Sequence, residues 1–185
     1  MQLDEQQLIK RLHDESTRRA AFEEMVRKYQ EPLYRLVRRM VLIHEDADDV
    51  LQNTFIKAWQ GIEKFRGDSS LGTWLYRIAS HEALDHLEKN KHLCASIDDE
   101  DSPGTMSIAA KLEGDPFFDG DEVERQLQEA IASLPNKQRL VFNMKYYDEM
   151  KYEDMSQVLG TSVGALKASY HHAVQKISKF FGLGD

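Results

Sequence analysis

Cysteine is almost missing from this 185-residue chain, because Cys94 is the only one and no disulfide can form within the chain. A lone thiol fits a reducing cytoplasm. Proline and glycine are scarce, with four and ten residues, and the apolar residues recur with helical spacing almost throughout. No apolar run reaches the ~18 residues of a membrane-spanning helix, and residues 1–15 lack the layout of a signal peptide. We therefore expect an all-α, cytoplasmic protein without membrane insertion.

A surplus of basic residues is also lacking. The net charge is −8, and it is unevenly distributed: segment 93–121 carries −7, residues 1–92 carry −1, and residues 122–185 carry none. Neither flank is basic enough to hold nucleic acid strongly through phosphate contacts alone. If this chain reads DNA, another molecule must supply most of the affinity.

Helical periodicity divides the chain into two blocks. Four helices are predicted in the first block, over Asp4–Arg18, Ala20–Val41, Glu45–Lys64 and Ser70–Asn90, and Pro32 is expected to kink or divide the second of them. Segment 93–121 is rich in Asp, Gly and Ser and has no sustained period, which predicts a flexible linker. Helices resume at Glu122. The predicted architecture is two small helical domains, 1–92 and 122–185, joined by a long acidic linker.

The segment from Tyr152 to Ile177 has the pattern of a helix-turn-helix. A short first helix ends at Gly160, the residue type that best tolerates a positive φ. Ser162 can cap a second helix, whose inward face is predicted from Val163, Leu166, Tyr170, Val174 and Ile177. Its other face carries Lys167, Ser169, His171 and His172. Such a pair can enter a DNA major groove, although a plain helical hairpin has the same local pattern.

Two further segments have polar faces that suit binding. Asp48, Asp49, Gln52 and Asn53 share one side of the predicted third helix; this side is either a solvated face or a docking face for a partner. The segment from Phe65 to Ala79 joins a polar loop to a helix with Trp74 and Arg77. Aromatic and arginine side chains beside a polar loop suit stacking on unpaired bases, and inward packing of the aromatic residues is the alternative.

Enzymatic chemistry has little support. His81, Glu82, Asp85 and His86 are similar to the H-E-x-x-H zinc helix, but Asp85 takes the second ligand position and His86 lies about 100° further round the helix. No glycine-rich phosphate loop accompanies them, and two domains on a linker lack the shared rigid cleft of most enzymes. The sequence predicts a non-enzyme with no catalytic residues, metal or cofactor; a zinc hydrolase is the minor alternative.

In their order and spacing, these motifs resemble those of bacterial RNA polymerase sigma factors of the extracytoplasmic-function branch of the sigma-70 family. The resemblance rests on Asp46–Trp59 (DADDVLQNTFIKAW), Phe65–Asp68, Thr73–Ala79, Asp85–Leu87, Leu134–Pro135, and Val163–Gly164 with Lys167. It covers about Phe22 to Phe181, nearly the whole chain. No single motif is decisive, but their order within a two-domain layout is highly specific.

The resemblance implies an alternative sigma factor that binds core RNA polymerase, through its β′ and β subunits, and directs it to particular promoters. It assigns polymerase docking to Asp48, Asp49, Gln52 and Asn53, and melting and capture of the minus-ten element to Arg66, Asp68, Ser69, Ser70, Thr73, Trp74, Arg77 and His81. It assigns reading of the minus-35 element to Lys167, Ser169, His171 and His172. The linker would run through a channel lined for RNA, which suits its negative charge. An anti-sigma factor is a further expected partner.

This chain departs from the family pattern at four positions where arginine is usual: Ser80, Ser169, His172 and Val174. Each lost arginine–guanine contact removes about 1–3 kcal/mol of base discrimination, so the promoter sequence cannot be inferred from relatives. The competing prediction is a dimeric helix-turn-helix regulator that acts without polymerase. It requires a basic DNA-binding domain and a palindromic site, and the zero net charge of residues 122–185 counts against it.

Overall fold

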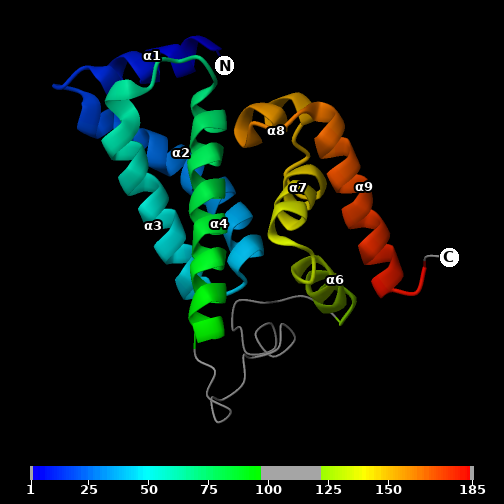
Figure 1. Ribbon diagram of the computed structural model, residues 1–185. Helices are drawn as coiled ribbons and strands as arrows, with labels where there is room; N and C mark the ends of the chain where they lie inside the picture. Colours follow the sequence, from blue (N-terminus) through cyan, green and yellow to red (C-terminus); the bar gives the residue numbers. More distant parts are fainter. Residues whose placement is uncertain (1, 97–121, 184–185) are drawn as a thin grey trace.

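The computed structural model describes residues 2–96 and 122–183, and every regular element within these ranges is a helix (Figure 1). The elements are α1 (Gln2–His13), α2 (Arg18–Val41), α3 (His44–Gly61), the 3₁₀ turn η1 (Ile62–Lys64), α4 (Leu71–Ser96), α6 (Glu122–Ala132), α7 (Asn136–Tyr146), α8 (Tyr152–Leu159) and α9 (Val163–Phe180). The predicted all-α fold class is confirmed. Helix α4 runs four residues beyond His92, and the remainder of the predicted linker lies outside the described residues.

Helices α1 to α4 form the N-terminal bundle, with α1 lying across the end at which α3 connects to α4 (Figure 1). Helix α2 supplies much of its core, because Met25, Leu33, Leu36 and Met40 are all fully buried. Pro32 lies inside α2 without dividing it. A proline inside a helix costs about 3 kcal/mol. The buried residues that follow Pro32 offset this cost by packing, so the predicted division does not occur.

The predicted helix-turn-helix is present as α8 and α9. Gly160 ends α8 with a φ of 62°, and its N–H donates to the carbonyl oxygen of Ser156. The hydroxyl oxygen of Ser162 then accepts a hydrogen bond from the N–H of Ala165 (3.3 Å), which caps α9. Helices α6 and α7 support this pair through a small apolar cluster that includes Ile131 and Phe142. The local stop and start signals therefore act as predicted.

One predicted core residue is placed differently. Val174 was expected to face inward, but 37% of its surface is exposed, whereas the neighbouring Ala173 is fully buried. Leu166, Ala173 and Ile177 make up the buried side of α9. These positions follow the 3.6-residue period of the helix, and position 174 lies about 100° around the helix axis from position 173. The expectation for Val174 is wrong because the inward stripe passes through the smaller alanine.

The two halves of the chain pack against each other and share one apolar core. Leu140 and Met144 of α7 and Met155 and Val158 of α8 belong to the same buried cluster as the core of the N-terminal bundle. Helix α8 lies beside α4, and α7 lies beside α2 and α4 (Figure 1). The sequence predicts two domains, but it contains no pattern that identifies these two faces as partners.

Buried polar groups bridge this contact. The guanidinium of Arg139 donates to the carbonyl oxygens of Met40 (2.8 Å), across the contact, and of Ala132, within the C-terminal half. Arg39 pairs with Asp148 at 3.0 Å. Burial lowers the pKa of Arg139 to about 10, and it raises the pKa of Asp148 although Arg39 opposes that change. Burial therefore disfavours the charged form of both groups.

Several buried polar atoms near this contact lack hydrogen-bond partners among the described residues. They are Nε of Arg139, Oδ1 of Asn143 and Oδ2 of Asp148, and each of them is buried. A buried polar atom without a partner costs about 1–3 kcal/mol. Separation of the two halves would expose such atoms to water, so the contact is weaker than an apolar core of the same size.

Candidate nucleic-acid interface

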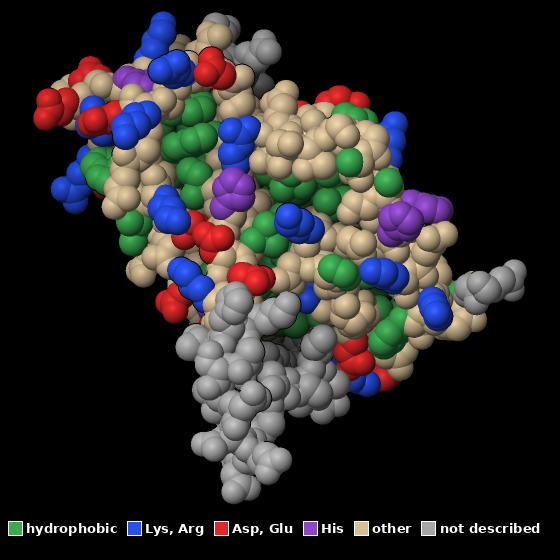
Figure 2. Space-filling model, viewed as in Figure 1, with side chains coloured by type: hydrophobic (Ala, Val, Ile, Leu, Met, Phe, Trp, Pro, Cys, Tyr) green, Lys and Arg blue, Asp and Glu red, His purple; other side chains and the backbone are tan. Residues whose placement is uncertain are grey.

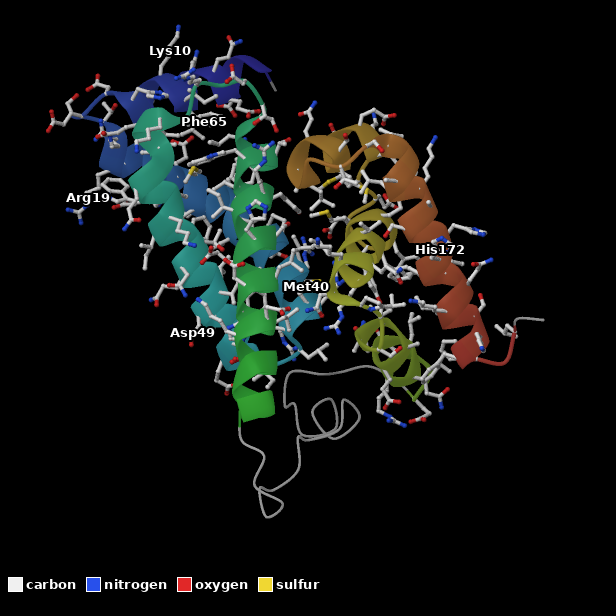
Figure 3. The ribbon with its side chains drawn as sticks, viewed as in Figure 1. Lys10, Arg19, Met40, Asp49, Phe65 and His172 are labelled. Atoms are coloured by element: carbon white, nitrogen blue, oxygen red, sulfur yellow. The ribbon has the colours of Figure 1, made fainter. Side chains whose placement is uncertain are left out.

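The predicted polar face of α3 is exposed over residues 48–53. Asp48, Asp49, Gln52 and Asn53 all point to solvent, whereas Ala47, Val50, Thr54 and Ala58 bury the opposite side. Asp49 lies on the side of α3 that is remote from the C-terminal helices (Figure 3). The carboxylate of Asp48 is 3.3 Å from Nε2 of His44. The four residues thus share one accessible surface, and their docking role stays a prediction.

A cavity of about 630 Å³ opens between α3 and α4. Trp74 and His81 line it, and both belong to the predicted minus-ten set. Trp74 packs its ring on Phe65 with centroids 4.9 Å apart. A Cβ atom on Gly61 would lie 3.3 Å from this indole, so the glycine permits the close approach. The cavity therefore has an aromatic wall, which suits a planar ring such as a nucleobase.

The other predicted minus-ten residues occupy two further places. Arg66, Asp68 and Ser70 are exposed on the loop that enters α4, and Ser69 is half-buried. Thr73 and Ser70 share a hydrogen bond of 2.8 Å at the start of the helix. Arg77 lies on another side of α4, where its guanidinium donates to the backbone carbonyl of Gln157 in α8. The eight residues therefore lie at three places, and at one of them, Arg77, the C-terminal half makes a contact.

Two cationic residues at this cavity were missed by sequence reasoning. Lys57 and Lys64 both line it, and Lys57 pairs with Glu82. Figure 2 shows apolar side chains between α3 and α4 with basic and histidine side chains beside them. Positions 57 and 64 are seven residues apart, so a helical-face count could have identified them.

On α9, Lys167, His171 and His172 are exposed, and Ser169 is half-buried. His172 projects from the outer side of the helix (Figure 3). Lys176 and Lys179 extend this surface and, with His172, line a second hollow of about 380 Å³. Sequence reasoning missed the two lysines, although they follow His172 at spacings of four and seven. Together these side chains give α9 a basic and imidazole-rich outer face.

Of the four positions where this chain lacks the arginine usual in the family, position 80 does not lie on the protein surface. Ser80 is fully buried, and its hydroxyl donates to the carbonyl oxygen of Tyr76 at 2.6 Å. A side chain at this position points into the protein, so its identity bears on packing. Ser169, His172 and Val174, by contrast, are all at least partly accessible.

The zinc-helix residues are engaged in other contacts. Glu82 pairs with Lys57, and His86 lies 3.3 Å from Asp46 and 2.9 Å from Asn90. Among the side chains that the structure describes, in residues 4–90 and 122–183, no group of three or more His, Cys, Asp and Glu is arranged to hold a metal ion. Nothing in these contacts supports the zinc-hydrolase alternative.

Two family models match this chain, one to each half. Sigma-70 region 2 matches residues 25–93, and Sigma-70, region 4 matches residues 124–177. These matches cover more than half of the chain. The chain belongs to the sigma-70 family of RNA polymerase sigma factors.

Its curated relatives place this sigma factor in the extracytoplasmic-function branch. It is 32% identical over 188 residues to the RNA polymerase sigma-H factor of Pseudomonas aeruginosa, covering 96% of this chain and 94% of the relative. It is 30% identical over 169 residues to the ECF RNA polymerase sigma factor SigW of Bacillus subtilis, covering 86% and 88%. This protein is accordingly an alternative sigma factor that directs transcription initiation, as the sequence motifs predicted.

Two solved structures share the fold. The structure of CnrH in complex with the cytosolic domain of CnrY matches with a TM-score of 0.69 and 21% identity, covering 98% of this chain and 99% of that one. The sigma factor RpoE of Bartonella quintana, in complex with the anti-sigma factor NepR, matches with a TM-score of 0.68 and 20% identity, covering 89% and 98%. Among the described helices of this sigma factor, none is long and apolar enough to cross a membrane.

Proposed function

We propose that this sigma factor divides promoter recognition between its two domains, 1–92 and 122–185, and docks on the β′ subunit of core polymerase through α3. The observation that most strongly supports this proposal is that each domain has its own surface suited to DNA. The cavity between α3 and α4 has an aromatic wall formed by Trp74 and a rim with His81, which suits unpaired bases of the minus-ten element. The outer face of α9, with Lys167 and His171, suits the major groove of the minus-35 element.

The dimensions of a promoter require the two domains to separate. Elements centred 25 base pairs apart, at about 3.4 Å per pair, are separated by about 85 Å. A compact chain of 185 residues has a radius of gyration of about 16 Å and hence a diameter of about 40 Å. The arrangement in which the two halves pack against each other, here called the closed arrangement, cannot reach both elements. The 25 residues of segment 97–121 can span at most about 80–90 Å, which is enough chain to permit separation.

The closed arrangement suits a free or inhibited form of the protein. In this arrangement Arg77, a predicted minus-ten residue, donates a hydrogen bond to the backbone of α8. We infer that an anti-sigma factor is a partner of this chain, because both matched proteins were solved in complex with another protein, CnrH with the cytosolic domain of CnrY and the sigma factor RpoE with the anti-sigma factor NepR. The role is non-enzymatic and belongs to the cytoplasm, where core polymerase acts; the polymerase performs the chemistry.

Reversal of charge on the docking face is expected to weaken polymerase binding. Asp49→Arg places a cation where the partner surface must complement an anion, so the affinity for core polymerase should fall at least about 30-fold. The measurement is a titration of labelled protein with core polymerase. The matched control is Glu15→Arg, which makes the same charge change at an exposed residue between α1 and α2. Equal affinities for the two variants would show that the docking face lies elsewhere.

Loss of the basic group on α9 is expected to affect minus-35 recognition selectively. Lys167→Ala removes an exposed cation near the start of the helix, and transcription from a promoter with an intact minus-35 element should fall about 10-fold. Polymerase affinity should be unchanged. Lys137→Ala removes another exposed lysine of the same domain and serves as the control. A parallel loss of polymerase affinity would contradict the proposed division of labour.

A further inference from the structure

Helix α1 contacts both ends of the loop that carries half of the predicted minus-ten residues. This loop, residues 65–70, joins η1 to α4. Residues 66, 67, 68 and 70 are exposed, so few of its own side chains pack into the core. The match to Sigma-70 region 2 begins at residue 25, so α1 lies outside the part of the chain to which the family model applies.

At the first end of the loop, the contact comes from His13. Its Nε2 atom lies 2.9 Å from the carbonyl oxygen of Phe65, 52 residues away in the chain. With its proton on Nε2, the imidazole donates to this oxygen. The start of α2 is tied to the same region, because Arg18, its first residue, pairs with Glu63 of η1 at 2.6 Å.

At the second end, the contact comes from Glu5. Its carboxylate oxygen accepts a hydrogen bond of 2.5 Å from the N–H of Leu71, the first residue of α4. The first N–H groups of a helix have no partner within the helix, and a negative charge is favourable there. Ser70 caps a second such group, the N–H of Thr73, at 3.0 Å. Glu5 therefore supplies to α4 a cap that the loop sequence itself does not provide.

Helix α1 is fixed firmly enough to hold these contacts. Leu8 and Leu12 are buried in the core of the N-terminal bundle, at 3% and 0% exposure. Arg11 pairs with Glu24 of α2 at 2.7 Å. Figure 3 shows Phe65 at the end of the bundle across which α1 lies. The polar residues on the loop side of α1 are thus presented from a packed helix.

We propose that α1 is a brace that holds loop 65–70 in its DNA-reading shape, with Glu5 and His13 as positioning residues. This inference rests on the proposed function. An ordered loop needs to lose less conformational entropy when it captures a strand, so a brace increases affinity for unpaired DNA without contacting it. It also follows that α1 affects minus-ten capture and leaves polymerase docking and minus-35 reading unchanged.

The test uses full-length protein in complex with core polymerase. The probe is a single-stranded oligonucleotide that copies the non-template strand across the minus-ten element of a promoter selected with the wild-type holoenzyme. Glu5→Ala removes the acceptor for the Leu71 N–H, and the affinity for the probe should fall roughly 3- to 10-fold, as expected for loss of one charge-assisted hydrogen bond. Glu5→Gln keeps a carbonyl acceptor and should remain within about 2-fold of wild type.

Two further variants separate positioning from a general loss of structure. His13→Ala removes the contact at the other end of the loop and should also lower probe affinity, whereas Asp4→Ala removes an exposed carboxylate of the same helix and should not. Wild-type affinity of both Glu5→Ala and His13→Ala would overturn the brace. So would an equal loss of core-polymerase affinity, because α1 would then support the whole domain. Failure of the wild-type protein to initiate transcription at all would refute the proposed function instead.

Discussion

A cleavable cross-link between positions 39 and 148 should abolish promoter-dependent transcription, and cleavage of the cross-link should restore it. Arg39 and Asp148 lie on opposite sides of the contact between the two halves, with their charged atoms 3.0 Å apart. Cysteines at both positions, in a Cys94→Ser background, can be joined by a bis-maleimide with an internal disulfide. The cross-link holds the two DNA surfaces within one compact body, which cannot span about 85 Å of promoter. Transcription should fall to about a tenth or less, since only molecules without the cross-link remain competent.

The matched control places the same cross-link inside the N-terminal half. Arg19 and Glu23 are also an ion pair, at 3.5 Å, but both belong to α2 of the first bundle. A cross-link there leaves the two halves free to separate, so transcription should be nearly unchanged. The 39–148 cross-link should act only on promoter use. Full transcription by the cross-linked protein would mean that the closed arrangement is already competent.

Arg139→Ala should destabilise the protein by about 3 kcal/mol or more, because the substitution leaves buried carbonyl groups without donors and opens a void. Arg139 is only 8% exposed, and its guanidinium donates to the carbonyl oxygens of Met40 and Ala132. It therefore joins the end of α6 to α2 of the other half. Urea denaturation followed by circular dichroism measures the loss as a change in the free energy of unfolding.

Arg35→Ala is the comparison for this substitution. Arg35 is on the surface, where its side chain is 56% exposed and pairs with Glu31 at 3.4 Å. Surface ion pairs of this kind contribute about 0–1 kcal/mol, so stability should change little. If Arg139→Ala cost no more than Arg35→Ala, the buried hydrogen bonds of Arg139 would not stabilise the fold.

Local features of this protein were predictable from its sequence. Gly160 ends α8 and Ser162 caps α9, because a positive φ and a side-chain cap depend only on neighbouring residues. The exposed stripe at Asp49 and Gln52 follows from helical periodicity alone. Pro32 was harder, because tertiary packing decides whether a helix continues through a proline.

Contacts between distant segments were not predictable. Arg139 reaches Met40 across 99 positions, and Glu5 caps Leu71 across 66. No periodicity in the sequence specifies which amphipathic faces meet or which carboxylate reaches a helix end. Of the predicted minus-ten residues, Trp74 and His81 line one cavity while Arg77 contacts α8. That division depends on how the two halves pack, which is information outside any single helix.

The most direct test of a split promoter reader that polymerase delivers to DNA is footprinting of a promoter selected from a library. The chain alone, core polymerase alone and the two together are compared at physiological salt. Only the combination should protect both elements, about 25 base pairs apart, because the C-terminal domain has no net charge with which to bind DNA by itself. Protection of a palindromic site by the chain alone would contradict delivery by polymerase and support a polymerase-independent regulator.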